Sequence, residues 1–295
     1  MRTLYKNINI LSRFICFNIC TPLLLKLTIS LIAFMLKIKG HKMIIKDEGY
    51  VLSARKYGEK ALIVTLFTLN EGKITGFVSD GLMPKNRGLF QPGNKLFFEA
   101  SARLEENMRR LFRIELTEPN AVMMMTDFKR LELMTAVMPM ITRILNENET
   151  VDMLYEIIGK FFKAQNLKEM LTWYAYFEFY ALEYLGLGLS LDCCAVTGQT
   201  EDLAYVSPKT GKAVCKEIGA PYHDRLFLYP HFVVDKSDTP SYAEIFNVLK
   251  MTEFFLSQNF FKFHNLPMPK TRETLWQFYE TEETEQQEEQ IAVGF

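Results

Sequence analysis

The sequence predicts an α+β protein, with a small β-barrel over residues 43–119 and an α-helical domain over residues 120–280. Two observations carry this prediction. Five short runs rich in β-branched and aromatic residues alternate with turn signals in the first region. Apolar residues recur at helical spacing in the second region. A loop-rich insertion at about 190–235 interrupts the helices and holds three of the five cysteines.

The composition bounds the class of protein. Of the 295 residues, 48% are hydrophobic and 23% are charged, which excludes collagen and a fully disordered chain. Five cysteines are too few for a disulfide scaffold. The length is sufficient for two domains with separate cores.

The β-type runs of the first region have clear boundaries. They are Tyr50–Ala54, Ala61–Leu69, Lys73–Ser79, Lys95–Ala102 and Leu111–Leu116. Alternation in the last run predicts two faces, with Phe112, Ile114 and Leu116 on one and Arg113 and Glu115 on the other. Five short strands within 77 residues indicate a closed barrel, which leaves no strand edge exposed.

The charge is divided unevenly along the chain. The formal net charge of the whole is −1, but residues 1–42 carry seven Lys/Arg and no Asp or Glu. Residues 55–113 hold eleven basic and six acidic residues, whereas residues 120–295 hold fifteen basic and twenty-five acidic residues. This pattern indicates a basic functional surface on the barrel and an acidic helical body.

A five-stranded barrel with basic strand ends and loops matches the OB-fold mode of binding single strands, in which cations follow phosphates and aromatic rings stack on bases. We expect seven residues to contact phosphates: Arg55, Lys56, Lys60, Lys85, Arg87, Arg103 and Arg110. The candidate stacking residues are Tyr57, Phe77, Phe90 and Phe97. Tyr57 is the best placed because it lies among basic residues, and for the other three we favour a place in the core.

The second region contains five predicted helices, at 127–146, 150–164, 168–185, 241–261 and 271–279. The third is apolar nearly all round, which predicts a central buried helix. A cofactor pocket among its aromatic residues is the sharper alternative. Residues 281–295 are rich in Glu and Gln, and we interpret them as an acidic, solvated tail.

Three basic residues on the first of these helices, Lys129, Arg130 and Arg143, are candidates for binding an acidic partner peptide. The alternative is that each is an ordinary solvated surface residue.

The insertion carries half of a zinc-ribbon pattern. Structural zinc sites usually contain two Cys-x2-Cys pairs, but Cys194 is followed three positions later by Thr197, and Cys215 by Ile218. Neither replacement supplies a thiolate. The residues that could complete a site, only at irregular spacing, are Cys193, His223, His231 and Asp192. We therefore expect a degenerate site without zinc or another cofactor, and no Cys194–Cys215 disulfide in a reducing cytosol.

The first 42 residues are apolar and basic. A membrane span over 14–36 would place Lys26 at its centre, which insertion scales penalise by roughly 2.5–3.5 kcal/mol. Met43 begins a sequence of ordinary soluble character. We interpret residues 1–42 as the product of a misassigned start, with a membrane anchor as the alternative.

Catalytic signatures are absent from the sequence. It contains no P-loop, no His-Glu-x-x-His, no Gly-x-Ser-x-Gly and no dinucleotide fingerprint, and only four histidines. We therefore predict that the protein is not an enzyme. An enzyme acting on a small molecule in the aromatic helical domain remains an alternative.

Three parts of the sequence form an ordered pattern at natural spacing: Asp47–Lys60 with Ile63–Thr68, Leu89–Asn94 with Ala102–Glu106, and Cys194–Gly198 with Ala204–Gly211. This pattern resembles the RecO family of bacterial recombination and repair mediators over about 43–275. The Cys-Ala-Val-Thr-Gly form of the third part resembles alphaproteobacterial members.

The resemblance implies an N-terminal OB domain, a helical domain and an inserted ribbon that binds zinc in some relatives. It implies a non-catalytic, cytoplasmic protein that binds single- and double-stranded DNA and anneals complementary strands. The implied partners are RecR, the acidic tail of single-stranded DNA-binding protein and, indirectly, RecA, which it helps to load. The alternative is a protein-interaction scaffold, membrane-anchored or soluble, that does not bind DNA.

Overall fold

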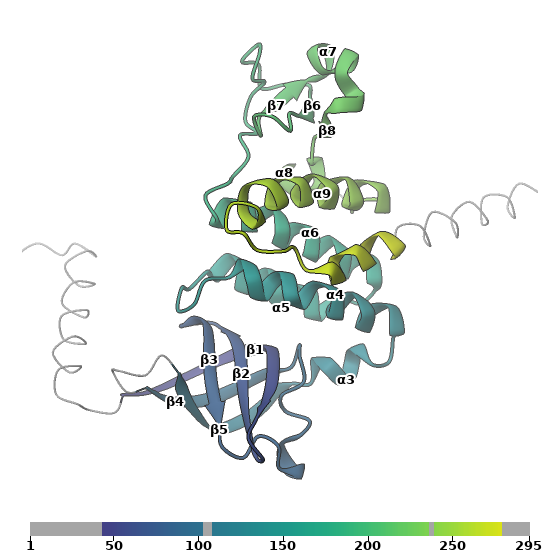
Figure 1. Ribbon diagram of the computed structural model, residues 1–295. Helices are drawn as coiled ribbons and strands as arrows, with labels where there is room; N and C mark the ends of the chain where they lie inside the picture. Colours follow the sequence, from purple (N-terminus) through teal and green to yellow (C-terminus); the bar gives the residue numbers. More distant parts are fainter. Residues whose placement is uncertain (1–42, 103–107, 236–238, 279–295) are drawn as a thin grey trace, which may run out of the picture. The chain divides into compact units, whose positions relative to one another are not determined.

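The computed structural model describes residues 43–102, 108–235 and 239–278 (Figure 1). The predictions for residues 1–42, for Arg103 and for the tail 281–295 lie outside these residues. The chain divides into a small unit, Met1–Ile44 with Ser101–Asn107, and a large unit, Ile45–Ala100 with Met108–Phe295. The contacts below belong to the large unit. Among the described residues, no helix is long and apolar enough to span a bilayer.

The N-terminal region is a closed barrel with the strand order β1-β2-β3-β5-β4. The strands are β1 (Met43–Tyr57), β2 (Ala61–Thr68), β3 (Gly72–Val78), β4 (Lys95–Ala102) and β5 (Arg109–Glu118). Strands β1, β2 and β3 form an antiparallel meander, and β3 pairs with β5 in parallel. The predicted five-stranded OB-type barrel is confirmed.

Successive side chains along β2 and β3 point alternately into the barrel and away from it. The residues that fill the core of these two strands are even-numbered: Leu62, Val64, Leu66, Ile74 and Val78. Odd-numbered residues such as Ile63 and Phe77 therefore point away from the barrel interior, although Ile63 is itself buried and Phe77 is half-buried.

Strand β5 differs from the predicted alternation. Leu111 is buried and Ile114, three positions later, also packs on the barrel core, whereas Leu116 is exposed. Arg113 lies between them with φ of 48°, a left-handed conformation that shifts the side-chain alternation. The prediction that Phe112, Ile114 and Leu116 share one face was wrong for this reason.

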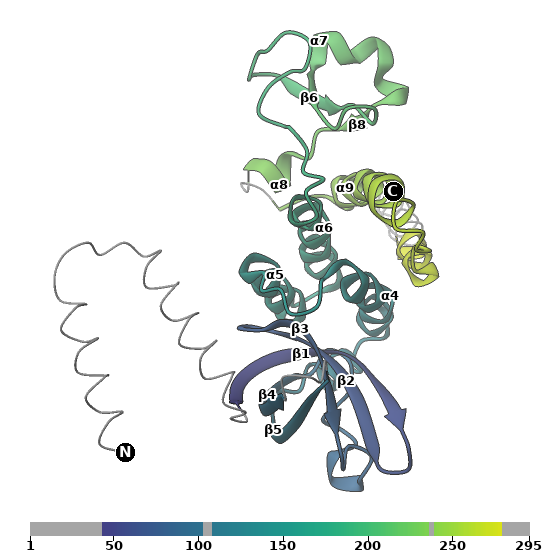
Figure 2. The same ribbon diagram turned by 60° about the vertical axis from the view of Figure 1, so that its left-hand side comes forward.

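The helical domain contains the predicted long helices. They are α4 (Phe128–Ile144), α5 (Asp152–Lys163), α6 (Leu167–Tyr184) and α9 (Tyr242–Phe255), which continues as a π-helical turn through Phe261. A short helix, α3 (Asn120–Met124), precedes them, and a 3-10 turn (Lys270–Glu273) begins the last helix. Helix α6 packs against α4, α5 and α9 (Figure 2). Its inner residues are fully buried, as predicted for a central helix.

A buried ionic network joins α6 to the end of the helical domain. The carboxylate of Glu178, with no exposed surface, accepts hydrogen bonds from Nε and Nη2 of Arg272 at 2.9 and 2.7 Å. It also accepts bonds from the hydroxyl groups of Tyr174 and Thr252. Burial and the neighbouring Glu178 raise the pKa of Tyr174 well above its ordinary value. The network therefore ties the last turn, α6 and α9 together.

The insertion forms a small three-stranded sheet with the order β7-β6-β8. In chain order the insertion contains β6 (Leu203–Val206), β7 (Ala213–Cys215), α7 (Lys216–Gly219), a 3-10 turn (Ala220–Arg225) and β8 (Phe227–Leu228). The short helix α8 (His231–Asp235) follows them. We call β6, β7, β8 and the preceding 190–202 segment the ribbon. Cys194 and Cys215 meet in it, with 3.5 Å between their Sγ atoms. No third metal-ligating side chain joins them within the part of the chain that the structure describes.

The turn between β2 and β3 meets the helical domain. A Cβ atom on Gly72 would lie 1.9 Å from the backbone oxygen of Glu149, and φ of Gly72 is +69°. The ammonium group of Lys73 donates to the backbone oxygen of Thr142 at 2.9 Å. On β1, the ring of Tyr50 stacks on Phe162 of α5, with 5.1 Å between the centroids. We call this part of the barrel the covered end.

Candidate nucleic-acid interface

A row of outward-facing residues crosses four strands of the barrel. Arg55 of β1 is paired with Ile63 of β2, Ile63 with Phe77 of β3, and Phe77 with Arg110 of β5. Residues directly opposite each other on paired strands carry their side chains on the same face. The row therefore has an apolar centre and an arginine at each edge.

Two aromatic rings adjoin this row. Tyr57, the last residue of β1, meets Phe77 edge to face with 5.9 Å between the ring centroids. The side chain of Tyr57 is 57% exposed, and that of Phe77 is half-buried. An exposed ring held by a second ring is suited to stacking with a base. Of the other two candidates, Phe90 lies in the barrel core and Phe97 is half-buried on β4.

The loops beside the row also carry cations. The N–H of Leu82, after β3, donates to the backbone oxygen of Lys60, after β1, at 2.9 Å. This bond places the β1–β2 and β3–β4 loops side by side. The second loop continues into a 3-10 turn (Pro84–Asn86) that contains Lys85 and is followed by Arg87. Lys60, Lys85 and Arg87 are all exposed.

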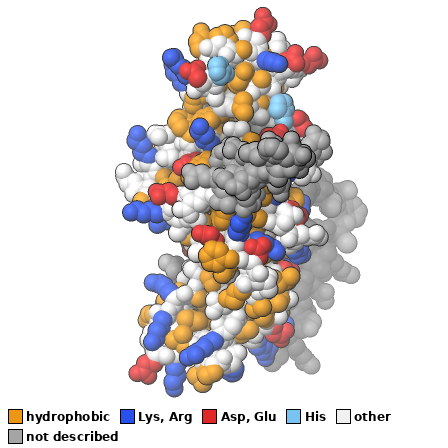
Figure 3. Space-filling view, turned by 90° about the vertical axis from the view of Figure 1, so that its right-hand side faces the viewer, with side chains coloured by type: hydrophobic (Ala, Val, Ile, Leu, Met, Phe, Trp, Pro, Cys, Tyr) orange, Lys and Arg blue, Asp and Glu red, His pale blue; other side chains and the backbone are white. Residues whose placement is uncertain are grey.

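Six of the seven predicted phosphate-binding residues can thus be placed, and all six are exposed: Arg55, Lys56, Lys60, Lys85, Arg87 and Arg110. We call these six, with Tyr57 and Phe77, the open basic face. Lys85 forms a pair with Asp80 at 3.6 Å, and both side chains are exposed. The other five form no ion pair within the described residues. Figure 3 shows Lys and Arg side chains gathered on the lower part of the molecule, over the barrel.

The remaining cations of the barrel are held by carboxylates. The pairs are Lys46–Glu99 at 3.4 Å, Lys73–Glu147 at 3.6 Å, Lys95–Glu48 at 2.7 Å, Arg109–Glu71 at 2.8 Å and Arg113–Glu99 at 3.1 Å. A cation that is already paired gains less from a phosphate than one that faces water alone. Among the described residues of the barrel, the cations without an ion pair therefore all belong to the open basic face.

Comparison with known families agrees with the two-part architecture. Residues 43–120 match the family model described as Recombination protein O N terminal, and residues 125–278 match the one described as Recombination protein O C terminal. The chain belongs to the RecO family. Its members are proteins of DNA repair and recombination, and the N-terminal model corresponds to the OB-fold barrel.

Individual relatives carry the same description, DNA repair protein RecO. The protein of Bartonella tribocorum is 35% identical over 239 residues, which is 80% of this chain and 95% of the relative. That of Xanthobacter autotrophicus is 37% identical over 71% of this chain and 86% of its own length. That of Wolbachia pipientis is 35% identical over 77% of this chain and 96% of its own length. The resemblance to the RecO family read from the sequence is confirmed.

The candidate partner-peptide residues do not form one cluster. Lys129 and Arg130 lie in the first turn of α4 and Arg143 in its last turn. Thirteen residues of helix separate Arg130 from Arg143, a rise of about 20 Å. Arg130 donates to the backbone oxygen of Ala164, and Arg143 to that of Pro267. Both arginines thus hold chain segments together, and their role in partner binding stays a prediction.

An exposed apolar patch next to Lys129 was missed by the sequence analysis. Val122, Met123, Met125 and Phe128 are 58–76% exposed on α3 and at the start of α4. The run of three methionines at 123–125 was the available signal, because consecutive flexible apolar residues outside a helical period are seldom all buried. The patch adds apolar contact area beside the basic start of α4.

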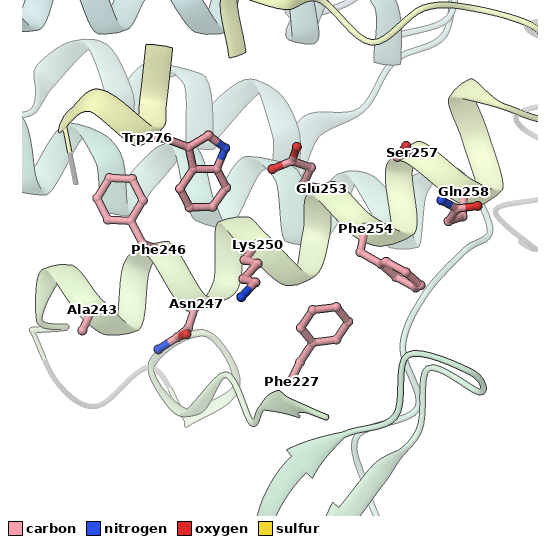
Figure 4. Close-up of a pocket in the computed structure, with 10 residues that line it drawn as sticks. All are labelled: Phe227, Ala243, Phe246, Asn247, Lys250, Glu253, Phe254, Ser257, Gln258 and Trp276. Atoms are coloured by element: carbon pink, nitrogen blue, oxygen red, sulfur yellow. The ribbon is translucent and has the colours of Figure 1, made fainter. Parts of the chain in front are cut away.

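A groove of about 660 Å³ lies along α9 (Figure 4). Aromatic rings from Phe227, Phe246, Phe254 and Trp276 surround Lys250 in it. None of the described lining residues is a histidine or a cysteine, and the lining carboxylate, Glu253, is paired with Arg272. The ionisable side chains that line the groove are thus Lys250 and Glu253.

Proposed function

We propose that the protein binds single-stranded DNA through the open basic face. The observation that supports this most is the contrast within the barrel. Five exposed cations have no carboxylate partner in the described residues, and two of them, Arg55 and Arg110, lie at the edges of the row that contains Phe77. Cations on both edges of the outward row are suited to follow a phosphate backbone, and the rings between them are suited to bases. Double-stranded DNA would use the cations without the rings.

The energetic basis of this binding is electrostatic. Each phosphate that a cation neutralises releases condensed counterions. The logarithm of the association constant therefore falls linearly with the logarithm of the salt concentration, with a slope of about −0.7 per phosphate contact for single strands. The acidic helical domain opposes this attraction, because residues 120–295 hold ten more acidic than basic residues. DNA contact is therefore confined to the barrel, and the helical domain is left for protein partners.

In DNA repair, we propose that the protein acts as a mediator in the cytoplasm, without catalysis or a bound cofactor. It would anneal complementary strands and, with RecR, help to load RecA on DNA coated by single-stranded DNA-binding protein. Membership of the RecO family supports this role. The acidic tail of single-stranded DNA-binding protein would dock at Lys129 and Arg130, where the exposed patch around Phe128 offers apolar contacts. Arg143 lies too far along α4 to share that contact.

The test is a salt titration of binding by fluorescence anisotropy, with the full chain and labelled single-stranded DNA. In the variant Arg55→Glu/Arg110→Glu we expect weaker binding and a salt slope reduced by about 1.4. The matched control is Lys46→Glu/Arg113→Glu, which makes the same charge change at exposed cations that Glu99 already holds. If the two variants lose affinity and slope equally, the open basic face is not the binding site.

A further inference from the structure

The ribbon contains two buried thiols that the proposed function does not use. Cys194 and Cys215 are 2% and 1% exposed, and both are free. Their Sγ atoms are 3.5 Å apart. Thr197 Oγ1 lies 3.9 Å from Sγ of Cys215, so the side chain three positions after Cys194 brings a hydroxyl group to the pair and not a third thiol. The pair is isolated from other metal-ligating side chains of the described residues.

Backbone hydrogen bonds hold the two chain segments at this spacing. The N–H of Ala195 donates to the oxygen of Ala213 at 2.8 Å, one residue after Cys194 and two before Cys215. The N–H of Cys215 points at Sγ of Cys194 at 3.3 Å. A disulfide requires about 2.05 Å between the sulfurs, so the sulfurs must approach by roughly 1.5 Å. We expect rotation of the two side chains to bring the sulfurs together while these backbone hydrogen bonds persist.

Cys194 is placed to react first, because its sulfur accepts a hydrogen bond from the N–H of Cys215, which stabilises the thiolate. Burial by itself would raise the pKa of its thiol, but hydrogen bonds from Thr197 and from backbone N–H groups, including that of Cys215, lower it to about 6. The thiolate is the form that reacts with oxidants. Cys215, in contact with it, is in position to act as the resolving thiol.

We propose that Cys194 and Cys215 form a reversible disulfide when the protein meets hydrogen peroxide, and that this bond fastens the 194–198 turn to strand β7. In the first step the thiolate of Cys194 attacks one peroxide oxygen, the O–O bond breaks, and a sulfenic acid and hydroxide form. In the second step the sulfur of Cys215 attacks Cys194, and the sulfenic oxygen leaves as water. Two protein thiols and one peroxide thus give one disulfide and two waters.

The bond would change the stability of the ribbon and not the charge of the barrel. Closing a loop of about 20 residues restricts the unfolded chain, so oxidation should raise Tm by about 5–10 °C. This proposal does not rest on DNA binding, because the open basic face contains no cysteine. DNA binding and disulfide formation can therefore succeed or fail independently.

The experiment is peroxide treatment of the full chain. The chain carries Cys16→Ser and Cys20→Ser, which remove the two thiols that lie outside the ribbon. Remaining thiols are then blocked, and the protein is digested without reductant for mass spectrometry. We expect a peptide pair linked through Cys194 and Cys215 that dithiothreitol separates. We also expect the rise in Tm on oxidation, and its reversal on reduction.

Two variants sharpen the result. Cys193→Ser removes the neighbouring thiol and should leave the cross-link and the Tm shift intact. Cys215→Ser should lose both while keeping the Tm of the reduced protein, which shows that it still folds; Cys215→Ala serves if it does not. The proposal is overturned if the cross-link involves Cys193, if Cys194 is oxidised to sulfinic acid without a cross-link, or if peroxide leaves both thiols free.

Discussion

At the covered end of the barrel, Lys73 and Arg109 are held by Glu147 and Glu71 against the rest of the fold. On the open basic face, Arg55 and Arg110 extend toward solvent without such a partner in the described residues. Both regions carry cations on short strands, so local positive charge alone does not distinguish the covered end from the open basic face. The difference lies in their surroundings, because carboxylates from the turns and the helical domain neutralise one set and leave the other free. Pairing, more than the number of positive charges, decides which surface can bind phosphate.

The largest effect should come from the covered end. Replacing Gly72 by Ala forces a Cβ atom against the backbone of Glu149 at a position with φ of +69°, and should lower the free energy of unfolding by about 3–4 kcal/mol. Gly58→Ala is the control, because Gly58 has φ of +65° but nothing within 4 Å of its added Cβ atom. There we expect only the backbone strain, about 1 kcal/mol. Equal losses in urea unfolding would mean that the contact with Glu149 contributes nothing.

The next effect concerns binding. Replacing Lys60, Lys85 and Arg87 together by Ala removes three exposed cations from the adjoining loops and should weaken single-stranded DNA binding roughly 50-fold at physiological salt. The free energy of unfolding should stay within about 0.5 kcal/mol of the original, because surface positions contribute little. Anisotropy and urea unfolding measure the two quantities. A variant that keeps its affinity and its salt slope would exclude the loops from the interface.

A smaller and more specific loss is expected at the ring pair. Tyr57→Ala should remove stacking worth about 1–3 kcal/mol per base, while the salt slope stays unchanged because no cation is lost. Tyr57→Phe keeps the ring and should bind normally. If Tyr57→Ala weakened single- and double-stranded DNA equally, the ring would not be reading unstacked bases.

The smallest effect concerns how the stability of the fold depends on pH through Glu99, the carboxylate that pairs with Lys46 and Arg113. Although Glu99 is shielded, which raises its pKa, hydrogen bonds from Arg113 and Lys46 outweigh this and hold the pKa below its ordinary value. A carboxyl group whose pKa is lower in the folded than in the unfolded protein stabilises the fold at pH values above its unfolded pKa. This stabilisation is lost as the pH falls through the folded pKa. Between about pH 5 and 3 the protein should therefore lose slightly more stability than Glu99→Gln. Thermal unfolding across this range would show parallel curves if the pairs do not matter.

The sequence was sufficient to predict the barrel strands, the long helices and the family, and the reasons can be seen in particular residues. Strands β2 and β3 have a regular apolar period. The six placed cations lie near strand ends or in loops, where long charged side chains usually stay in water. The shift at Arg113 was not predictable, since a left-handed conformation at a residue other than glycine is an exception. Within the described residues Arg109 forms an ion pair and Arg110 does not. This difference was not predictable either, because the partners of Arg109 come from distant parts of the chain.

Other errors came from treating neighbours on a helix as neighbours in space. Lys129 and Arg143 share α4, and their separation of fourteen positions already implied opposite ends. The exposed patch around Met123 was passed over because the predicted helix began after it. The zinc-ribbon pattern did imply that Cys194 and Cys215 meet, but the strands of the ribbon are only two to four residues long, too short to leave a period in the sequence.

The parallel contact between β3 and β5 rests on two residue pairs, Gly76 with Arg109 and Phe77 with Arg110, whereas β2 and β3 pair along seven. A seam of two residue pairs should open more readily than the β2–β3 hairpin, so its amide protons should exchange with solvent sooner. Phe77 and Arg110 belong both to the seam and to the open basic face. A DNA strand bound across that face would contact both strands of the seam. It would slow amide exchange there, so the barrel would be most resistant to opening in the DNA-bound protein.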